Sequence, residues 1–397
     1  MDNCSIAVVG SGLVGAAATL SLSKRLPGYQ IHWLDRGSME PPAQAAEMEA
    51  RVIVCTPGSQ TYLDTLGAWQ QVESYRVQSY QTMRVWDQLG GAAIEFQSRE
   101  LGVPQLGSIV EVSELLRALY SRISIQGNVR LWPQCAVESL IELQQQRKLI
   151  LSSGETIECE LVVGADGSRS TLRELAAIKT RVRPMQQQAI VAVVSHKYQH
   201  QSTAWQAFGE SGPLAFLPLP DDENGEHQSA IVWSMDDHTA AIISQLSDAE
   251  IKPLLESGID SRLGEIKSVR QRATFPLQQL HAHNYVLPGL CLLGDAVHTV
   301  HPLAGQGANL GFRDVAALER ELCRAQARRV WVGDMSVLRR YERSRKLENL
   351  TMLAGMEAFR HGFGSRRAGL RWLFNEGMRQ VSRWGFIKNQ FAKQAMH

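Results

Sequence analysis

The glycines at the start of the chain constrain its fold more than any other feature. An apolar strand expected over Ile6 to Val9 runs into Gly-Ser-Gly-Leu-Val-Gly at residues 10–15, and a helix is expected from about Leu13 to Ser23. A second expected strand, Ile31 to Leu34, ends on Asp35. Strand, glycine turn, helix, strand and terminal acid in this order are the fingerprint of a dinucleotide-binding βαβ unit. The sequence therefore predicts a Rossmann-like α/β domain.

Each residue of this fingerprint has its own predicted role. Gly10 permits the tight turn, Gly12 lets a pyrophosphate approach the backbone, and Gly15 lets the helix pack closely on the strand. Asp35 can accept hydrogen bonds from ribose hydroxyls, and the adjoining Arg36 is placed in the same cofactor-binding set. The helix directs its positive end at the phosphates. A purely structural glycine turn is the alternative interpretation.

Two later runs also bring an acid to the end of an apolar strand. Residues 161–170, LVVGADGSRS, deliver Asp166 to a glycine turn, a pattern that taken alone fits any strand-to-helix connection. Residues 294–314, GDAVHTVHPLAGQGANLGFRD, set Asp295 after an apolar strand and continue through a proline-containing loop into a glycine-rich helix start. The order of the three runs along the chain is more specific than any one of them.

Together these runs resemble the flavoprotein aromatic hydroxylases, the single-component FAD monooxygenases with the para-hydroxybenzoate hydroxylase fold. Within that family the chain is most similar to the ubiquinone-biosynthesis hydroxylases, which oxidise a polyprenylated phenol ring. The similarity covers nearly the whole chain. Further runs that carry it are 66–69, 83–87, 107–111, 212–219 and Arg339 to Lys346. The resemblance implies FAD as cofactor, O2 as co-substrate, and NAD(P)H or a separate reductase as electron source.

The same resemblance adds residues to the expected cofactor site. It implies that Asp295 holds the ribityl or ribose hydroxyls and that Asp166 belongs to the cofactor set. Arg51 matches the family arginine on a mobile loop beside the flavin, with a surface salt bridge as the alternative.

The loop before the last glycine-rich helix suits a reduced, anionic flavin. Its backbone N–H groups and the positive helix end can stabilise negative charge on the ring. Glycines at 305 and 307 let the backbone come close to that ring. The cofactor-binding residues expected here are Pro302, Gly305, Gln306, Gly307, Ala308 and Asn309.

Two histidines flank this loop and are candidate bases. Histidine titrates near neutrality, so His298 or His301 could deprotonate a phenol, although His298 could instead hydrogen-bond its own loop. The resemblance implies oxygen transfer from a C4a-hydroperoxyflavin, which needs no side-chain base. The expected catalytic set is His298, His301, Pro302 and Gly305. The six cysteines form no CxxC pair and no zinc spacing with histidine, so no metal is expected.

The chain order of the strands predicts an interrupted FAD-binding domain with an inserted substrate-binding sheet and a C-terminal helical segment. The FAD-binding domain is expected in residues 1–72, 101–182 and 276–335, the sheet in 73–100 and 183–275, and the helical region in 336–397.

Composition is that of a folded protein with a substantial core. The chain has 397 residues, 44% hydrophobic and 20% charged, with a net charge of +1, and no nucleic-acid partner is expected. A strand begins within a few residues of the N-terminus, and no apolar stretch approaches the roughly 20 residues that span a bilayer. We therefore expect a cytoplasmic protein.

The last part of the chain is unusually basic. Residues 365–397 contain seven Lys and Arg residues against one acid, interleaved with aromatic and aliphatic side chains. Such a basic amphipathic segment lies on an anionic membrane or on a partner, or else its apolar face packs on the FAD-binding domain. We expect peripheral association with the inner face of the membrane.

The predicted function is hydroxylation of a polyprenylphenol ring in ubiquinone synthesis. The run from Arg339 to Lys346 resembles the branch that acts at C5, which we favour, whereas residues 202–206 resemble the C6 branch, and C1 is a third choice. The rival functions are a flavin reductase or dehydrogenase of prenyl substrates and a non-catalytic FAD-binding scaffold. Other ubiquinone-biosynthesis proteins are expected partners, and self-association is left open.

Overall fold

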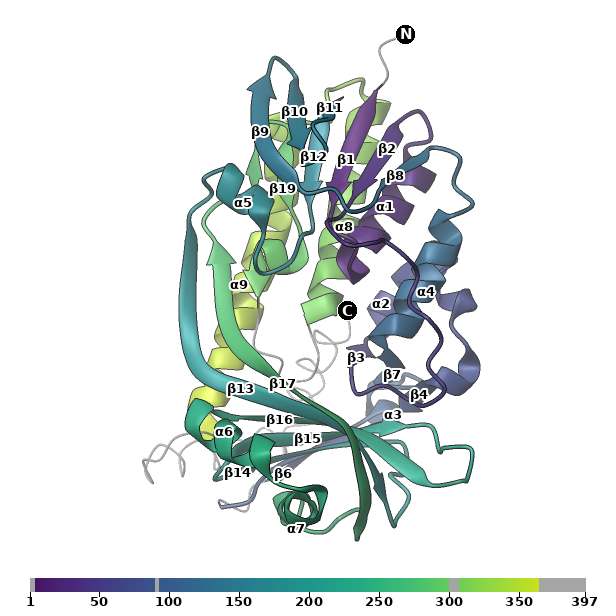
Figure 1. Cartoon of the computed structure of the whole chain (residues 1–397), viewed down its shortest axis with the longest axis vertical. Helices are drawn as coiled ribbons and strands as arrows, with labels where there is room; N and C mark the ends of the chain where they lie inside the picture. Colours follow the sequence, from purple (N-terminus) through teal and green to yellow (C-terminus); the bar gives the residue numbers. More distant parts are fainter. Residues whose placement is uncertain (1–3, 90–92, 300–306, 364–397) are drawn as a thin grey trace.

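A computed structural model describes residues 4–89, 93–299 and 307–363. A mainly parallel six-stranded sheet and its helices form the upper part of Figure 1, and a large eight-stranded sheet forms the lower part. The six strands, in spatial order, are β18 (Val286–Leu287), β19 (Leu290–Leu292), β12 (Leu161–Gly164), β1 (Ser5–Val9), β2 (Gln30–Leu34) and β8 (Val129–Trp132). The helices α1 (Leu13–Arg25), α4 (Val112–Ile123) and α8 (Gly307–Ala327) pack together beside this sheet. The predicted Rossmann-like unit is confirmed.

The turn between β1 and α1 is built on close backbone contacts. Gly10 has a φ of +115°, and a Cβ placed on it would lie 2.2 Å from the carbonyl oxygen of Ala165. A Cβ on Gly15 would lie 2.0 Å from the carbonyl oxygen of Gly10. Side chains are therefore excluded at both positions, because the β1 turn, the start of α1 and the end of β12 touch one another through backbone atoms.

The eight-stranded sheet is formed by segments far apart in the sequence. Its strands, in spatial order, are β20 (His298–Thr299), β17 (Ile266–Ala282), β13 (Thr180–His196), β16 (His227–Asp236), β15 (Gly212–Leu219), β14 (Thr203–Gly209), β5 (Thr82–Asp87) and β6 (Ala93–Gln97). The 17-residue strands β13 and β17 pair from Thr180 with Ala282 to His196 with Ile266 and run from the upper part of the molecule into the lower part.

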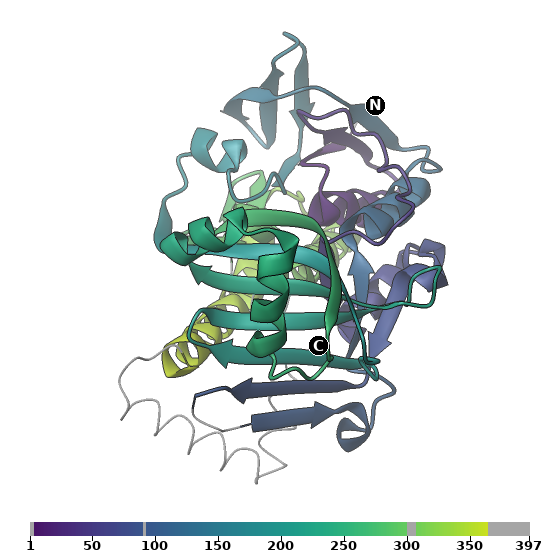
Figure 2. The same cartoon turned by 60° about the horizontal axis from the view of Figure 1, so that its bottom comes forward.

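The two faces of this sheet have different neighbours. The helices α6 (Asp237–Gln245) and α7 (Asp248–Gly258) cover the outer face, as Figure 2 shows. Phe216, Ile231 and Trp233 are buried beneath them with Ile251 and Leu255. Because side chains alternate along a strand, the residues between these point to the opposite face, toward the six-stranded unit.

Smaller elements complete the fold. The strands β3 (Val52–Cys55), β7 (Gly107–Glu111) and β4 (Val77–Tyr80) form one three-stranded sheet, and β9 (Val137–Leu143), β10 (Gln146–Leu151) and β11 (Thr156–Cys159) form another. The expected sheet segment 73–100 is thus divided, because β4 joins β3 and β7 whereas β5 and β6 join the eight-stranded sheet. Shorter helices are α2 (Pro57–Thr65), α3 (Ser98–Leu101) and α5 (Thr171–Leu175).

The chain continues from α8 into a long C-terminal helix, α9 (Met335–Phe363), so the predicted C-terminal helical segment is confirmed. Tyr341 on α9 is buried and donates a 2.7 Å hydrogen bond to the carbonyl oxygen of Leu292 on β19. Glu342 accepts a 2.8 Å bond from the backbone N–H of Tyr285. No helix in the described ranges is long and apolar enough to cross a bilayer. The basic segment 365–397 lies outside the described residues.

We predict that Gly15→Ala destabilises the protein. The added methyl group would force the Gly10 carbonyl to move, and overpacking of this kind costs about 1–3 kcal/mol. Gly28→Ala is the control, because a Cβ at Gly28 meets no atom within 4 Å. Urea unfolding of both variants and the wild type measures the difference. Equal stability of the two variants would contradict the packing argument.

Candidate active site

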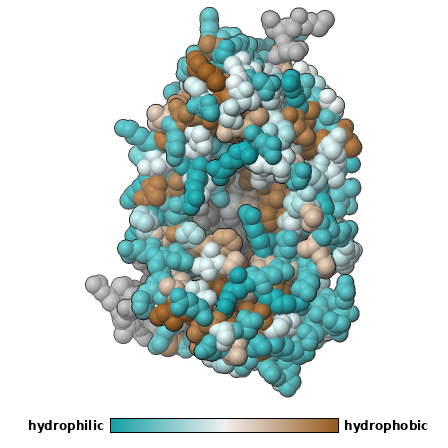
Figure 3. All heavy atoms as spheres, viewed as in Figure 1, coloured by the Kyte–Doolittle hydropathy of each residue, from teal (hydrophilic) through white to brown (hydrophobic). Residues whose placement is uncertain are grey.

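A cavity of about 930 Å³ separates the six-stranded unit from the inner face of the eight-stranded sheet. Figure 3 shows the surface hollowed between the upper and lower parts of the molecule. On one side the cavity is lined by the start of α1, the segments after β2 and before β3, and the turn after β19. On the other side it is lined by β13, β15, β16 and β17. The cavity therefore joins the glycine-rich fingerprint to the sheet.

The start of α1 fits an anionic ligand. The N-cap residue is Gly12, so no side chain at this position caps the helix, and the first turn contains no acidic residue. A Cβ at Gly12 would meet no atom within 4 Å, so the space in front of the helix is open, and Ser11 through Val14 line the cavity. Backbone N–H groups and the helix dipole thus face an open space suited to a pyrophosphate.

Asp35 is already engaged at the edge of this space. Its Oδ2 accepts a 2.7 Å hydrogen bond from the backbone N–H of Ser11, and its Oδ1 accepts a 2.7 Å bond from Gly37. The carboxylate therefore fixes the glycine turn, and a contact with ribose would use its remaining lone pairs. Arg36 is exposed and is not part of the cavity lining.

Asp166 lies in the turn between β12 and the short helix α5 and is not part of the cavity lining. Its Oδ2 accepts a 3.1 Å hydrogen bond from the backbone N–H of Leu172 on α5. Burial raises the pKa of its carboxyl, and backbone hydrogen bonds partly offset that effect. Its neighbours Ala165 and Gly167 do line the cavity. In this structure Asp166 holds the turn in place.

Asp295 and Arg51 both line the cavity. Asp295 lies on the single turn η3 (Gly294–Ala296) after β19, where it faces the cavity beside Gly307 and Ala308, the first residues of α8. Desolvation raises the pKa of the Asp295 carboxyl, and electrostatic interactions with His298 and Arg51 oppose this shift. The two residues place opposite charges around the cavity next to a helix start, an arrangement that suits hydroxyl and phosphate groups.

Asn309 lies behind the lining. Its side chain is fully buried, with Oδ1 accepting a 3.0 Å bond from the N–H of Thr56 and Nδ2 donating a 2.7 Å bond to the carbonyl oxygen of Val54. Asn309 therefore ties the start of α8 to β3, the strand that follows Arg51.

His298 belongs to a buried ionic cluster. Its Nε2 lies 2.6 Å from Oδ2 of Asp314, and both side chains are completely buried. Asp314 also accepts hydrogen bonds from the backbone N–H of Gly294, at 3.0 Å, and from Nε of Arg345 on α9, at 2.8 Å. The structure places the His298 ring outside the cavity lining, where it supports the turn that carries Asp295. The other expected loop residues, His301, Pro302, Gly305 and Gln306, lie outside the described residues.

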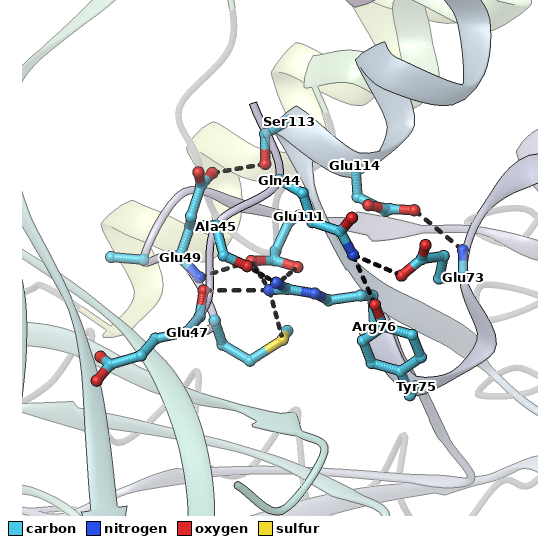
Figure 4. A network of polar contacts seen from close by, with 12 residues as sticks. Gln44, Ala45, Glu47, Glu49, Glu73, Tyr75, Arg76, Glu111, Ser113 and Glu114 are labelled. Atoms are coloured by element: carbon cyan, nitrogen blue, oxygen red, sulfur yellow. Dashed lines mark hydrogen bonds and ion pairs between the residues drawn. The ribbon is translucent and has the colours of Figure 1, made fainter. Parts of the chain in front are cut away.

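A second buried ion pair, which the sequence analysis did not identify, positions the segment before Arg51 (Figure 4). Nη1 of Arg76 lies 3.0 and 3.1 Å from the two carboxylate oxygens of Glu111 and 3.1 Å from the carbonyl oxygen of Glu47. Glu111 accepts a 2.7 Å bond from the N–H of Glu49. Burial raises the pKa of Glu111, although the N–H of Glu49 and the charge of Arg76 favour its ionised form. The pair is separated by 35 residues, so no local pattern reveals it.

The eight-stranded sheet holds the same segment from its other side. Oε1 of Gln271 on β17 accepts a 3.0 Å bond from the N–H of Ala50, and its Nε2 donates a 3.0 Å bond to the carbonyl oxygen of Met48. Contacts from both units therefore fix the backbone on which Arg51 stands. No cluster of three or more potential metal ligands occurs in the part of the chain that the structure describes.

We predict that Gly12→Val folds normally but binds FAD at least about tenfold more weakly, equivalent to ~1.4 kcal/mol. The new side chain finds open space in the protein but occupies the approach to the helix start. Gly127→Val is the control, because Gly127 also has open space around it and lies outside the cavity lining. Thermal unfolding and FAD titration check both variants. Wild-type FAD affinity in folded Gly12→Val would place the cofactor elsewhere.

We predict that Asp295→Asn weakens FAD binding by about tenfold, because a hydrogen bond to a charged acceptor is worth roughly 1.5–3 kcal/mol. The amide keeps the shape of the carboxylate but removes its charge. The matched control is Asp64→Asn, an exposed position on α2. Equilibrium dialysis against FAD gives both affinities. Unchanged affinity in the Asp295 variant would remove this carboxylate from the cofactor site.

Comparison with known proteins identifies the family. A family model described as the FAD binding domain matches residues 3–351. The chain is 33% identical over 391 residues to the 3-demethoxyubiquinol 3-hydroxylase of Escherichia coli K12, covering 98% of each protein. It is 32% identical to the ubiquinone hydroxylase UbiL of Rhodospirillum rubrum, covering 98% of this chain and 89% of the relative. It is 30% identical to the human ubiquinone biosynthesis monooxygenase COQ6, with coverages of 97% and 91%.

Solved structures with the same fold include p-nitrophenol 4-monooxygenase PnpA of Pseudomonas putida, with a TM-score of 0.78, 16% identity and 99% of each chain covered. Another is PqsL of Pseudomonas aeruginosa in complex with 2-aminobenzoylacetate, with a TM-score of 0.76, 20% identity and coverages of 95% and 99%. These structures support the fold, and the sequence relatives identify the branch. The chain belongs to the FAD-binding-domain family and, within it, to the ubiquinone-biosynthesis hydroxylases, so that it is a flavin-dependent aromatic-ring monooxygenase with FAD as its cofactor.

Proposed function

We propose that this enzyme hydroxylates the ring of a polyprenylated phenol or hydroquinol in ubiquinone synthesis. The observation that carries the proposal is the cavity of about 930 Å³, which joins an uncapped helix start to a sheet wall without charged side chains among its described residues. The helix start suits the phosphates of FAD, and the wall suits an uncharged ring. The names of the E. coli, R. rubrum and human relatives all refer to ubiquinone or its synthesis.

The division of roles follows from this geometry. FAD, when bound, supplies the chemistry that activates O2 with two electrons from NAD(P)H or a separate reductase. The N–H groups at the start of α1 would bind the pyrophosphate, and Asp295 with the start of α8 would hold the hydroxyl-bearing part of the cofactor. The apolar sheet wall would exclude water, which protects a reactive oxygen species from breakdown.

C5 is our first choice for the hydroxylated carbon, based on the resemblance of the run from Arg339 to Lys346, with C6 and C1 as alternatives. That run lies on α9, where Tyr341 and Arg345 make buried contacts with the six-stranded unit, and none of its residues lines the cavity. The E. coli relative is named for position 3 of demethoxyubiquinol. The ring position therefore has to be determined by product analysis.

The basic segment 365–397 would bring the enzyme to its lipid-soluble substrate. Seven cations against one acid favour an anionic membrane surface, at about 1 kcal/mol per cation near that surface. On α9, which leads toward this segment, Leu347 and Leu350 are 72% and 44% exposed. A basic amphipathic segment can also lie on a partner protein, and we propose other proteins of ubiquinone synthesis as partners.

We predict that the purified enzyme with FAD, a reductant and a short-chain prenylphenol transfers one atom of labelled O2 into the ring. Mass spectrometry measures the label, and NMR of the product identifies the carbon. In cells that lack the gene, a quinone precursor without that hydroxyl should accumulate. The same reaction without added FAD, run with the FAD-free protein, is the control for flavin-independent oxidation. Consumption of reductant without label in the product would instead indicate a flavin reductase, and no turnover would indicate a scaffold.

A further inference from the structure

The inner face of the eight-stranded sheet presents rows of side chains to the cavity. The register pairs Gln206 on β14 with Ala215 on β15, Ala215 with Val232 on β16, and Val232 with Val191 on β13. These four residues therefore form a row across neighbouring strands, and all four line the cavity. Alternation along β16 places Ser234 on the same face, two residues beyond Val232.

Two of these five side chains, Gln206 and Ser234, are polar. Gln206 is 7% exposed and Ser234 is 3% exposed, so both are nearly removed from bulk water. Among the described residues, neither side chain has a hydrogen-bond partner, although both line the cavity. Gln271 on β17 differs from Gln206, since it uses both its amide oxygen and its amide nitrogen within the chain. The partner of Gln206 must therefore come from whatever occupies the cavity.

The free-energy cost of leaving the Gln206 amide and the Ser234 hydroxyl unpaired indicates what kind of ligand the cavity binds. An apolar ligand that displaced water would leave a buried amide unsatisfied, at about 1–3 kcal/mol. The amide of Gln206 offers an acceptor and two donors, and the hydroxyl of Ser234 can do both. A ring that carries hydroxyl or methoxy oxygens satisfies these groups, whereas an unsubstituted hydrocarbon does not.

The charged residues around the cavity also limit which ligand can bind against the sheet. The charged residues of the described lining are Glu40, Arg51 and Asp295, and all three come from the six-stranded unit and its loops. The sheet contributes only uncharged side chains to the lining. A carboxylated ring bound against this wall would meet no cation among the described residues of the sheet, and an unpaired buried charge is expensive. The wall therefore selects a neutral ring.

From these observations we infer that Gln206 and Ser234 are specificity-determining residues that bind the oxygen substituents of a neutral, oxygenated ring. The inference rests on the proposed function and names the substrate class that it requires. Because β15 lies between β14 and β16, the two residues stand roughly 10 Å apart across the strands. They would therefore contact different substituents of one ring.

The test compares ligands that differ by one oxygen group. The probes are 2-methoxy-6-prenylphenol, 1-methoxy-3-prenylbenzene, which lacks the hydroxyl, and 2-prenylphenol, which lacks the methoxy group. Each is titrated into the FAD-loaded enzyme and followed by the change in flavin absorbance. We expect the wild type to bind the first probe about tenfold or more tightly than the others, from the ~1–3 kcal/mol of an unpaired group.

The variants are Gln206→Leu, Ser234→Ala and the matched control Gln81→Leu, an exposed glutamine outside the cavity lining. Each cavity variant should lose the preference for one of the two oxygen groups, whereas Gln81→Leu should keep both. FAD content and thermal midpoint establish that each variant is folded. If Gln206→Leu does not fold, the smaller change Ser234→Ala decides the result.

Two outcomes separate this inference from the proposed function. If the wild type prefers the fully substituted probe and both folded cavity variants keep both preferences, the inference is wrong and the proposed function stands. If the wild type binds none of the three probes and oxygenates none of them, the proposed function fails, and the inference fails with it.

Discussion

The buried carboxylate of Asp314 is the interaction on which the cofactor side of the cavity depends. It accepts hydrogen bonds from Gly294, from His298 and from Arg345, so one side chain joins the η3 turn, the short strand β20 and the C-terminal helix α9. Burial alone would raise the pKa of Asp314, but the contacts with His298 and Arg345 outweigh it and lower the pKa to about 2. The stabilisation that this group contributes is present above the pKa of about 3.9 of an unfolded aspartate and is lost as the pH falls toward 2.

The site is assembled by both units of the molecule. β13 and β17 pass without interruption from the upper part into the eight-stranded sheet, and the segment before Arg51 is held by Arg76 and Glu111 on one side and by Gln271 on the other. A buried ion pair such as Arg76 and Glu111 adds little net stability, because the desolvation of two charges offsets much of their attraction. Its main effect is to fix the position of the backbone that it contacts. Positional accuracy is what a cavity shared by a cofactor and a substrate requires.

Residues that mark the family occur both at the cavity and away from it. The run from Arg339 to Lys346 makes buried contacts away from the cavity through Tyr341 and Arg345. The run 212–219, in contrast, contributes Pro213, Ala215 and Leu217 to the cavity lining. The wall that faces the proposed substrate includes small side chains, among them Ala189, Ala215 and Val232, at alternate positions of neighbouring strands.

The sequence alone determined those features that depend on residues close together in the chain. The Rossmann-like unit, the glycines at 10 and 15, the FAD cofactor and the family follow from strands, turns and acids within short stretches. The tertiary structure decided which of the candidate side chains face the cavity: Asp295 does, whereas His298 and Asn309 turn inward to partners 16 and more than 250 residues away. It also brought Gln206 and Ser234 to one face. Short stretches cannot encode these outcomes, because the partner of a buried polar group is chosen by packing between distant segments, and that packing exists only in the folded chain.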